Sequence, residues 1–387
     1  MYSVKIIVIG AGPIGSLLSL HLTEKNYEVV VLEEHKAPGL PRHCAGVISY
    51  ETLRLYGFNT SSSIVLNKLN GAYIVFPGGK ILHVYREGHV AYVVDRAKFD
   101  EKLATYSEEK GTVFFYSTEA KKLHFPGSKI VVETNRENFS CDKVFVCEGL
   151  SRRITRQLTE VKQKPLIGLN VDAEACFSFP KDHVYVFFSK KISDRLFGWI
   201  IPLGNNLVRI GTASTANTDK YLEALINKAC SAGILDKVKI LEKTGGLINV
   251  DGPLKHFVFL KDRAVLVGDS AGQTKPTTGG GLYYGGLGAI IAAKSPTGFI
   301  YEKKWWQKCG KDIKSMLFLR RVLDSLDDRD LEKIIKRVNL EELSALLSSK
   351  GMFDTQSKTV IELVKYFLKK PLAVIHVLTT LAKSLLF

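Results

Sequence analysis

The sequence lacks the cysteine spacing that a metal centre needs. Its six cysteines stand at positions 44, 141, 147, 176, 230 and 309, and no two of them form a CxxC pair. Zinc ribbons and cysteine-ligated iron–sulfur clusters use closely spaced cysteines. The sequence therefore predicts no metal site, and it predicts buried, inert thiols at most of these positions.

A signal peptide, internal repeats and low-complexity segments are also missing. The chain opens on an apolar strand pattern that runs into a glycine turn, and this opening has no charged leader or cleavage site. We therefore expect a cytoplasmic protein. The strongly apolar stretch at residues 369–387 is interrupted by His376 and Lys383, whereas a spanning helix needs about 20 mainly apolar residues. We expect a packed or interfacial helix there.

Acidic residues are too few to balance the basic ones. The chain has 54 Lys and Arg against 39 Asp and Glu, which gives a formal charge of +15. The basic residues are spread along the sequence rather than gathered in one arm, so we expect no nucleic-acid partner. An anionic membrane surface or a phosphorylated substrate fits the charge. The length of 387 residues allows two or three domains.

What the sequence does contain is a glycine turn between a strand and a helix. Residues 5–9 predict a strand, residues 14–24 a helix, and residues 28–32 a second strand with a continuous apolar run at 29–32. The glycines suit a dinucleotide, because they permit a tight turn, let the pyrophosphate approach the backbone and let the helix pack closely on the strand. An acidic residue after the second strand accepts hydrogen bonds from the ribose hydroxyls. The cofactor-binding candidates here are Gly10, Gly12, Pro13, Ile14, Gly15, Glu33 and Glu34.

A second glycine-rich segment, residues 268–281, follows an apolar strand at 264–267 and leads into a small-residue helix. Asp269 can accept from ribityl hydroxyls, and the glycine run can aim backbone amides and a helix N-terminus at the flavin, which stabilises its reduced anion. Two such segments about 250 residues apart favour FAD over NAD. The candidates are Gly268, Asp269, Gly279, Gly280 and Gly281.

The remaining patterns predict an α/β fold with an α+β insert. We expect a discontinuous Rossmann-like FAD-binding domain at residues 1–70, 90–160 and 255–295. A mostly antiparallel substrate-binding sheet is expected at 71–89 and 161–254, with a hairpin around Pro77-Gly78-Gly79. Residues 296–387 form the expected C-terminal helical region.

These features resemble the flavoproteins built like aromatic hydroxylases, and within them the geranylgeranyl reductase family, including the archaeal digeranylgeranylglycerophospholipid reductases. The resemblance covers nearly the whole chain and is most specific in the string Lys275-Pro276-Thr277-Thr278-Gly279-Gly280-Gly281. The other segments that carry it are residues 10–33, 41–46, 94–100 and 198–202. It implies FAD, an isoprenoid lipid substrate whose double bonds are saturated, and a cytoplasmic enzyme that works at the membrane.

The resemblance also implies roles for single residues. Arg96 contacts the FAD pyrophosphate or ribose, and Arg42 lies near the phosphates in a loop that also contributes Cys44, Ala45 and Gly46. Cys44 lies near the flavin face, where it orients substrate or relays a proton; a small residue buried under the loop is the alternative. The substrate-cavity candidates are Phe197, Trp199, Pro276, Tyr283 and Tyr284, with Trp199 and Cys44 placed in the catalytic centre. Glu148 replaces the Asp that related flavoproteins often have, which leaves its role open.

The expected reaction adds hydrogen across an unactivated isoprenoid alkene. Hydride from the flavin must be matched by a proton at the other carbon, and aromatic walls stabilise the developing positive charge by about 1–2 kcal/mol per contact.

The expected electron donor is a ferredoxin-like protein or NAD(P)H. A flavin monooxygenase or halogenase and a membrane-docked electron-transfer flavoprotein are the alternatives. A further hypothesis is that residues 371–387, flanked by Lys365, Lys369 and Lys370, cover a lipid tunnel or lie at the membrane interface.

Overall fold

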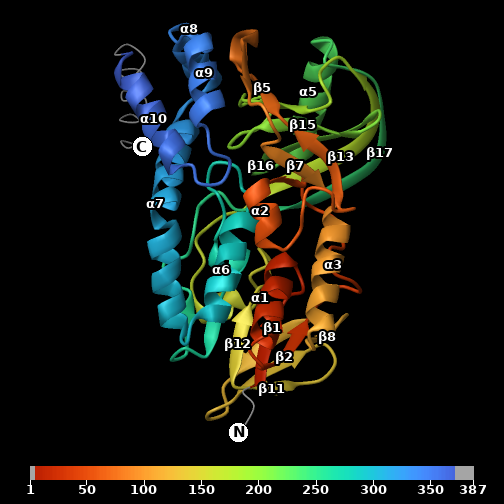
Figure 1. Ribbon diagram of the computed structural model, residues 1–387, viewed down its shortest axis with the longest axis vertical. Coiled ribbons are helices and arrows are strands. Elements are labelled where there is room, and N and C mark those ends of the chain that lie inside the picture. Colours follow the sequence, from red (N-terminus) through yellow and green to blue (C-terminus); the bar gives the residue numbers. More distant parts are fainter. Residues whose placement is uncertain (1–4, 371–387) are drawn as a thin grey trace.

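The computed structural model describes residues 5–370. Figure 1 shows two sheet-based halves stacked along the long axis, with the N-terminal strand in the lower half and a column of C-terminal helices along one side of both. The predicted segment at 371–387 lies outside the described residues. In the described part of the chain, no helix is both long enough and apolar enough to span a bilayer.

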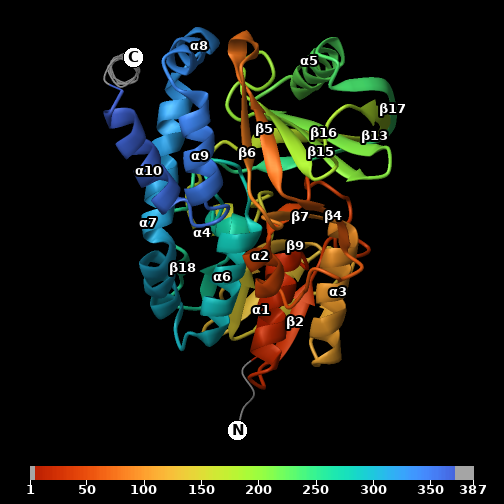
Figure 2. The ribbon, with the colours of Figure 1, turned by 45° about the horizontal axis from the view of Figure 1, so that its top comes forward.

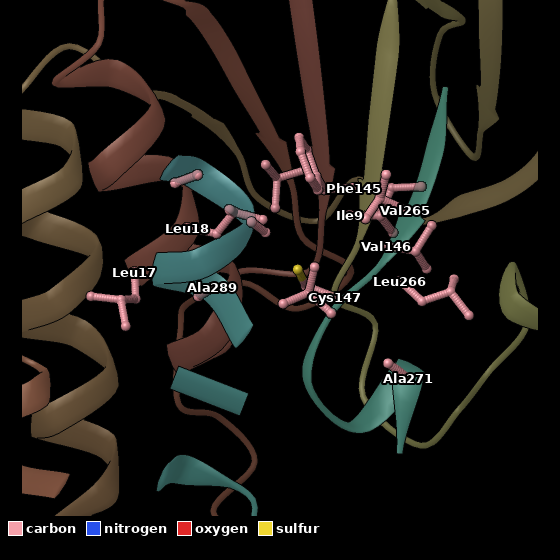
Figure 3. Packing of buried hydrophobic residues seen from close by; sticks show 14 of the residues in the cluster. Ile9, Leu17, Leu18, Phe145, Val146, Cys147, Val265, Leu266, Ala271 and Ala289 are labelled. Carbon is pink, nitrogen blue, oxygen red and sulfur yellow. The ribbon is translucent and has the colours of Figure 1, made fainter. Parts of the chain in front are cut away.

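The lower half is built on a six-stranded sheet, which is parallel except at one edge. The apolar runs that predicted its central strands are buried on both faces. Its order is β18 (Val258–Phe259), β19 (Ala264–Leu266), β12 (Lys143–Val146), β1 (Lys5–Ile9), β2 (Glu28–Leu32) and β8 (Val113–Phe115). Ile9, Val146 and Leu266 are in register across three of these strands, and Figure 3 shows them in the core.

Helices cover this sheet and meet one another. The helix α1 (Pro13–Thr23) packs against both α3 (Arg96–Glu109) and α6 (Leu282–Lys294). Leu18 of α1 and Ala289 of α6 belong to the same buried cluster as the strands (Figure 3). The small residues of α6 allow this close approach, because Gly285 leaves room for the side chain of Ile14.

The upper half is a seven-stranded sheet whose strands all come from two separated segments, residues 71–85 and 166–248. Its order is β17 (Leu235–Ile248), β13 (Leu166–Phe177), β16 (Leu207–Ser214), β15 (Gly198–Gly204), β14 (His183–Phe187), β5 (Gly71–Val75) and β6 (Ile81–Tyr85). The pairing is antiparallel apart from β14 with β5. The Pro77–Gly79 turn, η1, joins β5 to β6 as predicted. The exact domain boundaries stay a prediction.

Smaller elements complete the fold. One three-stranded sheet pairs β11 (Phe139–Cys141), β10 (Ile130–Thr134) and β9 (Ala120–His124), and another pairs β3 (Val47–Ser49), β7 (Ala91–Val94) and β4 (Val65–Leu69). The short helices are α2 (Tyr50–Leu55), α4 (Thr155–Leu158) and η2 (Gly268–Ala271), and α5 (Thr218–Ser231) packs on the large sheet.

The C-terminal helices form the column beside both halves (Figures 1 and 2). They are α7 (Gly298–Ser325), α8 (Asp328–Lys336), α9 (Leu340–Lys350) and α10 (Ser357–Leu368). α7 packs on α6, α9 packs on β6, and α10 packs on α7 and α9. The column therefore touches both the glycine-rich helix α6 and the upper sheet.

Candidate active site

The first glycine turn, residues 10–15, is shaped by close backbone approach. Gly10 has φ +102°, and a Cβ there would lie 2.5 Å from the carbonyl oxygen of Cys147. A Cβ on Gly15 would lie only 1.9 Å from the Gly10 oxygen. Gly12, the N-cap of α1, has no protein atom within 4 Å of its Cβ position, and Pro13 is the first helical residue. The helix N-terminus therefore opens at Gly12 to an anionic group.

Glu33 ties the end of β2 to this turn. Its Oε2 accepts a hydrogen bond from the Ala11 amide at 2.7 Å, and its Oε1 accepts one from the His35 amide at 2.9 Å. The Glu33 side chain is buried, so a carboxylate is held beside the turn; its role in ribose binding stays a prediction. Glu34 is exposed, and its predicted contact with the cofactor stays a prediction.

The fold brings the second glycine-rich segment, residues 268–281, against the first turn. A Cβ on Gly268, which has φ +72°, would lie 3.0 Å from the side chain of Ile14. The Asp269 carboxylate lies against Gly281, 2.5 Å from the Cβ position there. Burial raises the pKa of Asp269, although the nearby cations Arg152, His43 and Arg96 oppose the shift.

The glycine run itself is a closed turn with no room for side chains. The Lys275 amide donates to the Gly280 oxygen at 3.0 Å, and the Gly279 amide donates to the Lys275 oxygen at 2.7 Å. A Cβ on Gly279 would lie 2.1 Å from Ile248 of β17. Gly281 is the N-cap of α6, so the helix N-terminus begins at this turn as predicted.

Arg96 and the 34–46 loop lie close to this segment. Arg96 donates from Nε and an Nη to Asp100 at 3.1 and 3.0 Å and is nearly buried. Burial lowers the pKa of the Arg96 guanidinium, but the charge of Asp100 and the hydrogen bonds to it outweigh burial and raise the pKa. Arg42 forms an ion pair with Glu242 on β17, so its guanidinium is engaged with the upper sheet. The predicted contacts of both arginines with FAD stay predictions.

The guanidinium of Arg209 holds the backbone of the loop that carries Cys44. Arg209 of β16 donates to the Ala45 oxygen at 3.0 Å and to the Cys44 oxygen at 3.4 Å. Asp172 of β13 holds that guanidinium with two hydrogen bonds of 2.7 Å. Burial opposes the charge on Arg209, but the bonds from Asp172 and the nearby Cys44 raise its pKa. The upper sheet thus fixes the backbone of the loop that carries Cys44.

Gly46 fixes the other end of this loop. Its φ is +80°, and a Cβ there would lie 2.6 Å from the Val94 oxygen. The Val94 amide in turn donates to the Gly46 oxygen at 2.8 Å. The loop is therefore held from β7 and from the upper sheet at once.

An apolar wall faces the loop and the glycine run. Trp199 is buried, donates its indole Nε1–H to Asn170 at 2.9 Å, and contacts Phe197 edge-on at 6.0 Å between ring centroids. Both belong to a cluster that includes Ala45 of the loop and Ile248, the residue against Gly279. The structure therefore joins the predicted substrate wall to the loop that carries Cys44 and to the second glycine-rich segment.

The other substrate candidates lie in the turn before α6 and in the first residues of that helix. Pro276 is buried in the turn. Tyr284 is fully buried, and its hydroxyl donates to the Asp354 oxygen at 2.9 Å. Tyr283 is half-buried beside it, and burial raises the pKa of the Tyr283 hydroxyl to about 12. The bond to Asp354 directs Tyr284 toward the C-terminal helices, and the substrate contacts predicted for these residues stay predictions.

The sequence analysis missed two buried basic groups in the site. Lys275 donates to Asp354 at 2.9 Å, with both side chains buried, and lies over the Phe353 ring at 4.4 Å. Arg152 is buried, donates to the Asp269 oxygen at 3.0 Å, and has an Nε atom without a hydrogen-bond partner. No sequence signal marks either pairing, because the partners are 79 and 117 residues away.

Glu148, whose role the sequence left open, caps a helix. Its carboxylate accepts from the Ile154 amide at 2.9 Å and from the Thr155 amide at 2.7 Å. These are the first orphan amides of α4, so the longer side chain serves the local fold.

The site fits FAD on two structural grounds. The space over Gly12 is open where a pyrophosphate would approach the backbone, whereas Gly10, Gly15, Gly268 and Gly279 are closed by protein. The orphan Nε of Arg152 beside Asp269 provides a buried donor for a polar group.

Comparisons with known proteins agree with this geometry. The family model described as lycopene cyclase protein matches residues 5–285. An uncharacterized protein of Methanocaldococcus jannaschii is 28% identical over 93% of this chain and 94% of its own length. A digeranylgeranylglycerophospholipid reductase of Methanococcus aeolicus is 26% identical over 94% of this chain and 96% of its own length.

Solved structures share the fold. A geranylgeranyl bacteriochlorophyll reductase-like protein from Thermoplasma acidophilum superposes with a TM-score of 0.81 at 20% identity, over 98% of this chain and 99% of its own. A myxobacterial FAD-dependent halogenase, CndH, gives a TM-score of 0.65 at 17% identity, over 84% of this chain and 82% of its own. These matches confirm the predicted fold class. The chain belongs to the lycopene cyclase protein family, and its predicted place among the geranylgeranyl reductase-like flavoproteins is confirmed.

Proposed function

We propose that the protein is an FAD-dependent reductase that saturates the C=C bonds of geranylgeranyl chains in archaeal-type membrane lipid precursors. The observation that carries the proposal is the meeting of three parts: the first glycine turn, the second glycine-rich segment, and the apolar wall around Trp199. Curated relatives named as digeranylgeranylglycerophospholipid reductases match along nearly the whole chain, which supports the same substrate class.

FAD, when bound, supplies the hydride. Gly12 and the N-terminus of α1 would hold its pyrophosphate, and Glu33 would accept from the ribose. Asp269 and the amides of the 279–281 turn would hold the ribityl and ring end. The two glycine-rich segments are in contact: Gly268 lies against Ile14 of the first turn, and Asp269 lies against Gly281.

The protein's own part in the reaction is orientation, water exclusion and proton supply. An isoprenoid alkene has no carbonyl to accept charge, so a proton must reach one carbon as hydride reaches the other. Trp199 and Phe197 offer π faces that stabilise a developing cation by about 1–2 kcal/mol per desolvated contact. The Sγ of Cys44 is the proposed proton relay, and the guanidiniums of Arg96 and Arg209 beside it compensate the charge left by the departing proton.

Anaerobic turnover tests this function. The reduced holoprotein is incubated without oxygen with a panel of prenyl lipids that differ in head group, and the products are weighed by mass spectrometry. We expect a gain of two hydrogens for each saturated double bond. A gain of oxygen or halogen that requires air would overturn the reductase assignment in favour of the monooxygenases and halogenases that share the fold.

We also propose a cytoplasmic location with peripheral membrane contact through α10. Ile361, Val364 and Leu368 are spaced along one face of this helix and are 39%, 41% and 65% exposed. The exposed Lys358, Lys365 and Lys369 lie on the same helix or directly after it. An apolar stripe flanked by lysines is the pattern of an interfacial helix on an anionic bilayer. Electrons are expected from a separate donor, a ferredoxin-like protein or NAD(P)H.

A further inference from the structure

The charged side chains on the outward face of α7 are all basic; the face also exposes Phe318, near its C-terminal end. Six of its cationic side chains are exposed, and none has an ion-pair partner among residues 5–370: Lys303, Lys304, Lys308, Lys311, Lys314 and Arg321. At about 100° per residue these six fall within an arc of about 140°. From the first to the last they extend about 27 Å along the helix.

The acidic residues of α7 are all turned the other way and are already engaged. Glu302 accepts from the Phe257 amide, Asp312 accepts from the Ser357 amide at 2.9 Å, and Asp324 accepts from Arg195 at 2.8 Å. Nothing on this helix therefore neutralises the outward cations. The column of C-terminal helices in Figures 1 and 2 presents α7 at the side of the molecule.

The inner face of the same helix leads directly to the candidate flavin site. Trp306, at the edge of the basic face and half-buried, contacts Trp305 with ring centroids 5.2 Å apart. Trp305 donates its indole N–H to the Tyr284 oxygen at 3.1 Å. Tyr284 is the third residue of α6, the helix that begins at the 279–281 turn. The helix that carries the basic face thus contacts the helix that begins at the 279–281 turn.

We propose that this face of α7 docks an acidic one-electron carrier protein that reduces the flavin. The inference rests on the proposed function. Two reduced carriers each give up one electron and are oxidised, and FAD takes up the two electrons with two protons from solvent to become FADH2. Charge complementarity argues for this occupant, because electron-transfer encounters use small interfaces that opposite charges steer.

An anionic bilayer is the other class of surface that the lysines could attract. The two helices differ in a way that separates the two partners. α10 exposes three apolar side chains at helical spacing along one face. On α7 the exposed Phe299, Ile300 and Phe318 lie beyond the two ends of the stretch from Lys303 to Lys314, within which the exposed side chains are lysines and Gln307. Membrane adsorption gains from apolar insertion, so α10 suits the lipid and α7 the charged protein.

Charge reversal on the full-length holoprotein tests the proposal. The variant carries Lys304→Glu, Lys308→Glu and Lys311→Glu. The matched control carries Lys220→Glu, Lys228→Glu and Lys237→Glu, at exposed positions on α5 and at the start of β17. Both lower the formal charge from +15 to +9, so they differ in where the charge is lost. A second α7 variant carries Gln at the same three positions, so that the proposal can still be tested if the Glu variant misfolds. Thermal unfolding and flavin absorbance are measured for the unmodified protein, the two α7 variants and the control.

The probe is a purified ferredoxin of net negative charge. At about 10 mM salt, where the Debye length is about 30 Å, we expect the α7 charge-reversal variant to bind it at least about tenfold more weakly than the control. The rate at which reduced ferredoxin reduces the flavin falls in parallel, while reduction by dithionite is unchanged. The Gln variant lies between the two.

Two results would overturn the proposal. One is equal ferredoxin affinity and equal reduction rates in the α7 variant and the control. The other is a loss of binding to anionic vesicles in the α7 variant with ferredoxin binding intact, which would make the face a membrane contact. Since neither measurement uses a prenyl lipid, failure here is distinct from failure of the proposed lipid reduction.

Discussion

At the scale of single residues, two glycines of the first turn have different tasks: Gly12 leaves space for the cofactor, and Gly15 lets α1 pack against the turn. Gly12 has an ordinary φ of −62° and open space at its Cβ position, so Gly12→Ala places a methyl group only where the pyrophosphate would lie. We expect the stability of the apoprotein to change by no more than about 0.5 kcal/mol. The affinity for FAD falls at least about tenfold, which corresponds to about 1.4 kcal/mol. Flavin fluorescence titration and thermal unfolding measure the two quantities.

Gly15 provides the matched control for that substitution. A Cβ there would lie 1.9 Å from the Gly10 oxygen, so Gly15→Ala forces α1 away from the turn. Overpacking of this kind costs about 1–3 kcal/mol, and we expect the melting temperature to fall with or without FAD. Equal destabilisation by both substitutions would contradict the assignment of Gly12 to the cofactor.

Arg209 is expected to act as a positioning residue for Cys44. Arg209→Lys keeps the charge but loses the planar fork that bonds Asp172 and the loop carbonyls together. A loop displaced by about 1 Å lowers kcat for alkene reduction by up to about 100-fold with little change in KM. Alkylation of Cys44 by iodoacetamide becomes faster, because its loop is less restrained.

The control for Arg209→Lys is the rate at which dithionite reduces the flavin. Reduction by dithionite does not require the loop, so its rate stays that of the unmodified protein. If Arg209→Lys changed neither kcat nor the alkylation rate, the guanidinium would have only a packing role.

At the scale of secondary-structure elements, the turn before α6 is tied to the loop between α9 and α10. Lys275 and Asp354 are 7% and 6% exposed and form an ion pair. Lys275→Met leaves the Asp354 carboxyl buried without its cation, which costs about 3–5 kcal/mol. We expect faster amide hydrogen exchange in residues 351–356 and in the 275–281 turn together.

Asp354→Asn is the companion variant, since the amide still accepts hydrogen bonds from Thr52 and Ser49. It should raise exchange less than Lys275→Met does. The double variant should restore part of the protection, because no unpaired charge remains. Faster exchange in only one of the two segments would show that the pair does not couple them.

Local patterns predicted the elements well and their long-range contacts poorly. The expected strands at 5–9 and 28–32 match β1 and β2, and the expected helix at 14–24 is α1, Pro13–Thr23. These depend on apolar runs and turn glycines within a few residues of each other. The bonds from Arg209 to Ala45 span 164 residues, and no local periodicity encodes such a pairing. Glu148 illustrates a different limit: the amides it accepts from are only six and seven residues away, but α4 has four residues and is too short to give a periodic signal.

At the scale of the whole molecule, the net charge of +15 would attract any anionic bilayer weakly, so specific docking must depend on apolar insertion. The substitutions Ile361→Ser, Val364→Ser and Leu368→Ser remove the exposed apolar stripe of α10 without changing the charge. Each buried CH2 contributes about 0.8 kcal/mol, and we expect vesicle binding to weaken at least about tenfold.

The control for this stripe is Ile240→Ser with Leu241→Ser on β17, which removes side chains that are 55% and 49% exposed on the upper sheet. Cosedimentation with vesicles of anionic and of neutral lipid separates insertion from charge. Binding in the α10 variant should keep its salt dependence while losing strength, because the lysines remain. If the β17 variant weakened binding as much as the α10 variant, the bilayer would meet the upper sheet, and the lipid would approach the wall around Trp199 from that side.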